Sequence, residues 1–168
     1  LGYNDDHIVV LDRVAPLGTK LRTFCDELEK IPGVKNASYS STYLGFSSIY
    51  SSYQIKGMDK SKNFMFDVNY VDEDFFDTYG LSLTGKNGRF FNLKDLNDTM
   101  SIVINEAAVR EFGLKDPLNT IVQGPQPDGT TIEYKVIGVV EDFHQSTLMK
   151  TISPYMFIYK TESNTIPG

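Results

Sequence analysis

The spacing of hydrophobic residues changes along the chain, and each spacing predicts a type of element. One apolar stripe consists of Leu17, Leu21, Phe24, Cys25 and Leu28. Because most of these residues recur at intervals of three or four, residues 16–29 are expected to form an amphipathic helix. An apolar run at 7–11 precedes this helix, and an alternating run at 34–40 follows the break at Ile31-Pro-Gly33. Strand, helix and strand together predict a βαβ unit.

The remainder of the chain is expected to be rich in strands. The further segments with strand-like patterns are residues 53–58, 64–71, 101–104 and 134–140. The last of them is expected to be the second arm of a hairpin that spans residues 119–142, with its turn at Gln126-Pro-Asp-Gly129. Gly138, inside this arm, would let another part of the backbone approach closely.

Two short helices are predicted from their end signals. Asp72 is expected to cap the first helix and Gly80 to end it in the left-handed conformation. The residues expected to bury one face of this helix are Phe75, Phe76 and Tyr79. Asn105 is expected to cap the second helix, and Gly113 to end it.

Composition restricts the classes of partner. The chain has 168 residues, 40% of them hydrophobic, which is enough for a substantial core. The net charge of −6 and the scattered Lys and Arg residues argue against binding to nucleic acid or to a strongly anionic membrane surface. The longest apolar runs are much shorter than the ~20 residues that a spanning helix needs. With no initiator Met and no signal-peptide pattern, the chain is expected to come from between membrane segments.

The sequence does not predict an enzyme. It contains no glycine-rich phosphate loop, and its two histidines, His7 and His144, are not spaced as metal ligands. The acidic residues of 72–77 begin like a calcium loop, but Phe76 occupies a ligand position. We therefore expect no catalytic residue, no cofactor and no metal site. Cys25 could in principle pair with His144 as a nucleophile, but its place on the apolar stripe favours a buried, unreactive thiol.

The segment from Ser38 to Tyr53 is the strongest candidate for a functional surface. It alternates serine with aromatic residues, a composition favoured on recognition surfaces. The candidate contact residues for a partner or substrate are Tyr43, Phe46, Tyr50 and Tyr53. The alternative is a strand, loop and strand whose aromatic residues only cover the core.

Five sequence pieces, in this order and spacing, carry a resemblance to a known family. They are Val71-Asp-Glu-Asp-Phe-Phe-Asp-Thr-Tyr-Gly80, Gly88-Arg-Phe-Phe91, Ser101-Ile-Val-Ile-Asn-Glu-Ala-Ala108, Asp116-Pro-Leu-Asn119 and Val136-Ile-Gly-Val-Val-Glu-Asp-Phe-His144. Leu1-Gly-Tyr-Asn4 and Ile31-Pro-Gly-Val34 match more weakly. Together they resemble the extracytoplasmic, or periplasmic core, domain of MacB-like and FtsX-like ABC transporter permeases, and the resemblance covers nearly the whole chain.

The resemblance implies an α+β fold with two lobes. Residues 1–55 with 151–168 would form a βαβ porter-like subdomain, and residues 56–150 a smaller Sabre-like α+β insert. Relatives continue with a further strand, helix and strand, so the porter-like subdomain is expected to be incomplete at its C-terminal end. We would then expect an exposed sheet edge near Val9, Leu11 and the strand at 154–159.

The resemblance also implies a noncatalytic function. Such a domain lies on the periplasmic or extracellular face of the bacterial inner membrane and couples cytoplasmic ATP hydrolysis to the movement or gating of an export substrate. The implied partners are a second copy of the permease, a cytoplasmic ATPase reached through the membrane segments, and a periplasmic adaptor or outer-membrane protein. The alternative is an extracytoplasmic ligand-binding or sensory module with a similar α+β core.

Overall fold

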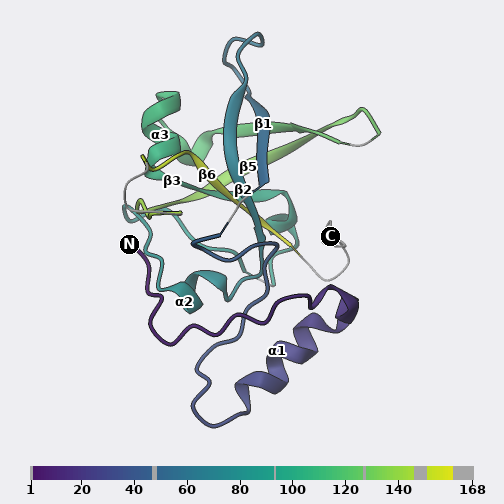
Figure 1. Ribbon diagram of the computed structural model, residues 1–168. Coiled ribbons are helices and arrows are strands. Elements are labelled where there is room, and N and C mark those ends of the chain that lie inside the picture. Colours follow the sequence, from purple (N-terminus) through teal and green to yellow (C-terminus); the bar gives the residue numbers. More distant parts are fainter. Residues whose placement is uncertain (1, 47–48, 93, 127, 146–150, 161–168) are drawn as a thin grey trace.

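The computed structural model is a β-barrel with helices and an N-terminal segment packed outside it (Figure 1). The structure describes residues 2–46, 49–92, 94–126, 128–145 and 151–160. The strands are β1 (Ile49–Ile55), β2 (Phe64–Val71), β3 (Ser101–Asn105), β4 (Ile121–Pro125), β5 (Thr131–Val140) and β6 (Tyr155–Tyr159). The helices are α1 (Leu21–Glu29), α2 (Phe75–Tyr79) and α3 (Glu106–Phe112), and the 3-10 turns are η1 (Ala15–Lys20), η2 (Leu96–Met100) and η3 (Pro117–Asn119).

The barrel closes in the order β1-β2-β6-β3-β5-β4. β2 pairs with β6 and β3 with β5 in parallel, and the other neighbouring strands are antiparallel. Closure gives most backbone groups a ladder partner and limits the length of free sheet edge.

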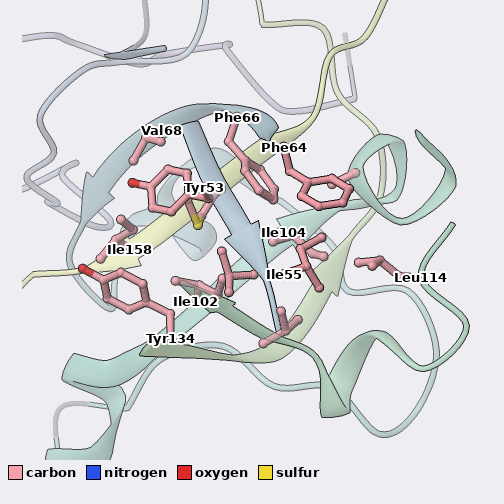
Figure 2. Close-up of a cluster of buried hydrophobic side chains, with 14 of the residues drawn as sticks. Tyr53, Ile55, Phe64, Phe66, Val68, Ile102, Ile104, Leu114, Tyr134 and Ile158 are labelled. Carbon is pink, nitrogen blue, oxygen red and sulfur yellow. The ribbon is translucent and has the colours of Figure 1, made fainter. Parts of the chain in front are cut away.

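One hydrophobic cluster fills the inside of the barrel. Figure 2 shows Phe66, Ile104 and Tyr134 among the side chains that converge there. Its fully buried members include Phe66, Ile102, Ile104, Val122 and Val136, each with 0% exposure. The aromatic and β-branched residues from which the strands were predicted therefore form the main core.

A second cluster lies between the outside of the barrel and α2. It contains the fully buried Phe76, Phe143 and Phe157. Along β6, Met156 and Ile158 belong to the first cluster, whereas Phe157 belongs to the second. β6 is thus buried on both faces, which explains its continuous apolar sequence.

The predicted short elements are largely confirmed. Asn105 caps α3 by accepting from the Ala108 N–H at 3.1 Å. α2 buries the three aromatic residues expected of it, and Gly80 ends it with a φ of 62°. β4 and β5 form the expected hairpin, whose turn is closed by a 3.0 Å bond from the Gly129 N–H to the Gln126 carbonyl. A Cβ at Gly138 would lie 2.5 Å from the Arg89 carbonyl oxygen, so the predicted close approach is also confirmed.

The predicted βαβ unit is wrong within the described residues. The expected helix forms as η1 followed by α1, but neither 7–11 nor 34–40 is a strand. His7 adopts a φ of 64°, which interrupts an extended run, and Val9 is 82% exposed. In the second segment, Ser40 makes one isolated bridge to Val71, while Ala37 and Tyr39 pack toward α1. The first segment has no strand partner in the described structure, and the second meets β2 in this single bridge, so neither segment forms a ladder.

Two strands expected in or beside the first lobe belong to the barrel. β1 begins at Ile49, earlier than the expected 53, and β6 lies between β2 and β3. The strand at 154–159 is therefore not a sheet edge, and that part of the expected exposed edge is wrong. The family-derived division into two lobes stays a prediction, and the strand pairing joins β1 and β6 to the strands of residues 56–150.

α1 and residues 34–39 form a small outer layer, called here the N-terminal layer, which Figure 1 shows set apart from the barrel strands. Its buried members are Leu21, Cys25, Ala37 and Tyr39. Cys25 is 4% exposed, which confirms the predicted burial, and burial raises the pKa of its thiol to about 11. The thiol is therefore protonated and unreactive at neutral pH.

Asp72 does not cap α2, contrary to the prediction. Its side chain turns toward the N-terminal layer, where it accepts from the Ser38 hydroxyl at 2.7 Å and the Tyr39 N–H at 3.0 Å. The residue preceding α2 is Asp74, which makes no side-chain cap. Burial raises the pKa of Asp72 to about 7, against the lowering effect of these hydrogen bonds.

Candidate interaction surface

Within the described residues, no group of three or more His, Cys, Asp and Glu side chains is placed to hold a metal ion. No helix in this part of the chain is both long and apolar enough to cross a membrane. The four candidate contact residues, Tyr43, Phe46, Tyr50 and Tyr53, all lie in the described part of the chain.

Tyr43 and Phe46 form a stacked pair at the start of this surface. Their ring centroids are 4.9 Å apart and the ring planes differ by 22°. Tyr43 is half-buried against the outer hydrophobic cluster, whereas Phe46 is 58% exposed. The outer cluster thus supports Tyr43, and Tyr43 in turn supports an exposed phenyl ring.

A buried amide holds the loop that carries this pair. Asn69, on β2, donates to the Thr42 carbonyl at 2.8 Å and accepts from the Thr42 N–H at 3.2 Å. It also accepts from the Ser41 hydroxyl at 3.0 Å. The Ser41 N–H donates to the Tyr70 carbonyl at 2.8 Å, and the Tyr70 N–H donates to the Ser41 hydroxyl at 3.0 Å. Because Asn69 is 0% exposed, these bonds fix the loop on the barrel.

Tyr50 and Tyr53 point to opposite faces of β1. Tyr50 is 64% exposed, whereas Tyr53 is 7% exposed and packs edge-on against Phe66 inside the barrel at 5.8 Å. Residues an odd number of positions apart in a strand lie on opposite faces, so this separation follows from the strand itself. Tyr53 is accordingly a core residue of the described structure, as the alternative for this segment held.

Ile49 is a further exposed apolar residue at this end of β1, although the sequence pattern did not single it out, and as the neighbour of Tyr50 in the strand it points to the opposite face. It is 40% exposed, and the limit of 3.8 Å per residue keeps its Cα within about 11 Å of that of Phe46. The set of Tyr43, Phe46, Ile49 and Tyr50 is called here the aromatic edge. Ile49 could have been recognised from the sequence as an apolar residue next to the tyrosines. Asn69, which anchors the loop that carries Tyr43 and Phe46, gave no sequence signal.

The aromatic edge lies in the longest stretch of the sequence without a charged residue, with Asp67 of β2 opposite Tyr50. Residues 36–55 contain no Lys, Arg, Asp or Glu, and Lys35 and Lys56 flank them. The whole chain, by contrast, carries a net charge of −6. An exposed apolar surface without charge is typical of the centre of a protein interface.

Comparison with known proteins places the fold in a transporter setting. Residues 12–164 match the family described as the MacB-like periplasmic core domain. No sequence among the curated proteins matches the chain.

Three solved structures share the fold at 20% sequence identity. A domain of a putative permease from Porphyromonas gingivalis has a TM-score of 0.57, with 85% of this chain and 59% of that one covered. The extracellular domain of the noncanonic ABC-type transporter YknZ from Gram-positive bacteria has a TM-score of 0.51, with 83% and 62% covered. The periplasmic region of MacB from Actinobacillus actinomycetemcomitans also has a TM-score of 0.51, with 94% and 57% covered.

The chain spans less than two thirds of each of these structures. The family match, in contrast, includes all six described strands and α1 to α3. The barrel, its helices and the predicted sequence pieces thus belong to one family, and the chain is a member of the MacB-like periplasmic core domains of ABC transporter permeases.

Proposed function

We propose that this domain works on the outer face of a bacterial inner membrane as the noncatalytic moving part of an ABC permease. Cytoplasmic ATP hydrolysis would drive membrane segments, and these would shift the domain against a second copy to move or gate an export substrate. The membership in the MacB-like family carries this proposal. A separate cytoplasmic ATPase and a periplasmic adaptor or outer-membrane protein are the further partners proposed.

The aromatic edge is the contact surface proposed for this work. An interface that is remade in each cycle must stay exposed in the single domain and keep its geometry. Phe46 and Tyr50 meet the first requirement by their exposure. The hydrogen bonds of Asn69 and the closed barrel meet the second.

The test uses the complete transporter in membranes. Phe46→Ser and Tyr50→Ser should lower export severalfold, while ATP hydrolysis continues, because coupling is lost and the ATPase is untouched. Leu96→Ser is the matched control, since Leu96 is 87% exposed and lies outside the aromatic edge. Export unchanged by both edge variants would overturn the proposed contact surface. A ligand whose binding is lost in the edge variants, without any transport, would instead indicate the ligand-binding or sensory function.

A further inference from the structure

Residues 2–4 pack against the outer hydrophobic cluster and are called here the strap. A Cβ at Gly2 would lie 2.5 Å from the Asp142 carbonyl oxygen, so no residue with a side chain fits there without a shift of the backbone. Two residues further on, the Asn4 N–H donates to the Tyr79 carbonyl at 2.8 Å. The backbone of the strap is therefore anchored on both sides of its central residue, once at the segment after β5 and once at the end of α2.

The side chain of Tyr3, the central residue, extends from the strap to the loop that carries the aromatic edge. Its ring lies edge-on to Tyr79, with centroids 5.9 Å apart, and edge-on to Phe143, with centroids 6.5 Å apart. At the far end of the ring, a Cβ at Gly45 would lie 3.4 Å from the Tyr3 hydroxyl oxygen. Tyr3 thus joins the strap to the backbone next to Phe46.

The loop has two separate supports. Its first part, at Ser41 and Thr42, is bonded to the side chain of Asn69. Its second part is bonded through Gly45, whose N–H donates to the Gln145 carbonyl at 3.1 Å. The second support is the one that lies beside the strap.

Tyr79 connects the same elements. Its carbonyl holds the strap through Asn4. Burial raises the pKa of the Tyr79 side chain, and a hydrogen bond from the Leu44 backbone to its hydroxyl acts in the opposite direction. Leu44 is itself buried in the outer cluster. The strap, the end of α2 and the loop therefore form one packed junction, through which a shift of one segment can reach another.

We propose that Tyr3 is a positioning residue for the aromatic edge, and that the position of the strap controls how the loop presents Phe46. A shift of the strap moves the Tyr3 ring, and the ring moves Gly45, which it contacts. Tyr43 and Phe46 stack on each other across Gly45 in the sequence, so they follow it. The strap is thus a point at which the contact surface can be regulated. The inference rests on the proposed function only in taking the aromatic edge as the contact surface.

Amide hydrogen exchange followed by NMR tests this link in the folded chain. Tyr3→Ala removes the ring, so exchange of the Gly45 N–H should become about tenfold faster or more, because this part of the loop opens more often. Tyr3→Phe keeps the ring, so its rate should stay within about threefold of the wild type. The Ser41 N–H, which donates to the Tyr70 carbonyl at the end of the loop held by Asn69, should not change in either variant. An unchanged rate at Gly45 in Tyr3→Ala would overturn the proposal.

Ile8→Ala is the matched control for a simple loss of packing. Ile8 is also half-buried against the outer cluster, but it lies outside the strap. Its removal should leave the exchange of Gly45 within about twofold of the wild type. Equal acceleration in Tyr3→Ala and Ile8→Ala, or equal acceleration at Gly45 and Ser41, would show a general loosening of the cluster and would also overturn the proposal.

A second variant displaces the strap and leaves Tyr3 in place. Gly2→Ala puts a Cβ against the Asp142 carbonyl, so the strap must shift, and exchange of Gly45 should again become about tenfold faster. Gly57→Ala is its control, because Gly57 has a similar φ, 87° against 82°, but no described atom lies within 4 Å of its Cβ. It introduces the backbone strain alone and should leave Gly45 unchanged.

No acceleration in Gly2→Ala, or equal acceleration in the two glycine variants, would contradict the link between strap and loop. Circular dichroism checks that each variant is folded. The pair of Gly2→Ala and Gly57→Ala decides the question if Tyr3→Ala is not.

Export by the complete transporter separates this inference from the proposed function. Tyr3→Ala should lower export, and its addition to Phe46→Ser should cause little further loss, because both changes act through one surface. If exchange of Gly45 accelerates as expected but export depends on neither Phe46 nor Tyr50, the positioning by Tyr3 stands and the proposed function of the surface is wrong. If Phe46→Ser lowers export but Tyr3→Ala changes neither export nor the exchange of Gly45, the contact surface stands and the positioning is wrong.

Discussion

The barrel and the N-terminal layer are held together by different forces. The barrel has two large hydrophobic clusters on the two faces of its central strands, with residues such as Phe66 and Phe157 at 0% exposure. The N-terminal layer has one small cluster, whose most buried member, Cys25, keeps 4% exposure. The barrel is thus stabilised by apolar burial, and the layer depends more on polar contacts.

Several of those polar contacts reach the stretch between β2 and α2. Arg22 pairs with Glu73 at 3.0 Å and with Asp74 at 2.6 Å, and Asp72 binds the layer through Ser38 and Tyr39. A sequence motif that looks like a helix start is therefore also the attachment point of a second structural layer. The strength of such an attachment depends on the charge of its groups and on their exposure to water. The stability of a packed core depends much less on either.

The largest expected effect distinguishes the two regions directly. Phe157→Ala should lower the free energy of unfolding by about 3–5 kcal/mol, because it leaves a cavity in the outer cluster of the barrel. Leu21→Ala, in the N-terminal layer, should cost about 2 kcal/mol, at the lower end for such a change, because its small cluster can collapse. Urea denaturation measures both. Equal losses would contradict the distinction between core and layer.

The attachment through Asp72 should depend on pH. The folded state keeps the proton up to about pH 7, whereas the unfolded state loses it near the ordinary pKa of 3.8. The stability due to this proton is complete below about pH 4 and is lost as the pH rises to about 7, by an amount on the order of 2–4 kcal/mol.

Asp72→Asn cannot titrate, so its unfolding free energy should fall less than that of the wild type between pH 5 and pH 8. Asp77→Asn, at an exposed position close by, is the control and should follow the wild type. Parallel pH curves for Asp72→Asn and the wild type would show that burial does not perturb this carboxyl group.

The ion pairs of Arg22 offer a smaller and local effect. Arg22→Ala should weaken the layer by about 1 kcal/mol, because the side chain is 26% exposed and partly screened by water. Native-state labelling of Cys25 by a thiol reagent reports the opening of the layer, and it should become roughly fivefold faster. Lys30→Ala removes an exposed pair with Glu27 at the C-terminal end of α1 and should leave the rate unchanged. A faster rate in both variants would point to loss of helix content instead.

The smallest effect is expected on β1. Tyr50→Ala should change stability by no more than about 0.5 kcal/mol, because its ring is exposed. Tyr53→Ala should cost about 3 kcal/mol or more, because its ring fills the barrel. Thermal unfolding compares the two. A large loss for Tyr50→Ala would mean that its ring supports the barrel and is not free for a partner.

The sequence by itself determined the elements whose signals are local. Asn105 and Gly113 define α3 because a side-chain cap and a left-handed end need only neighbouring backbone groups. The hairpin of β4 and β5 depends on a short turn in the same way. The five family motifs lie in this part of the chain, so the family too could be recognised from the sequence.

Tertiary structure decided what depends on distant partners. An apolar run such as 7–11 becomes a strand only if a neighbouring strand accepts its hydrogen bonds, and no described strand lies beside it. β6 is central because β2 and β3 pair with it from opposite sides. Asp72 could cap the helix after it or bind the layer, and folding brought Ser38 and Tyr39 within hydrogen-bonding distance. Local sequence sets what a residue can do, and the long-range packing of the chain selects among those options.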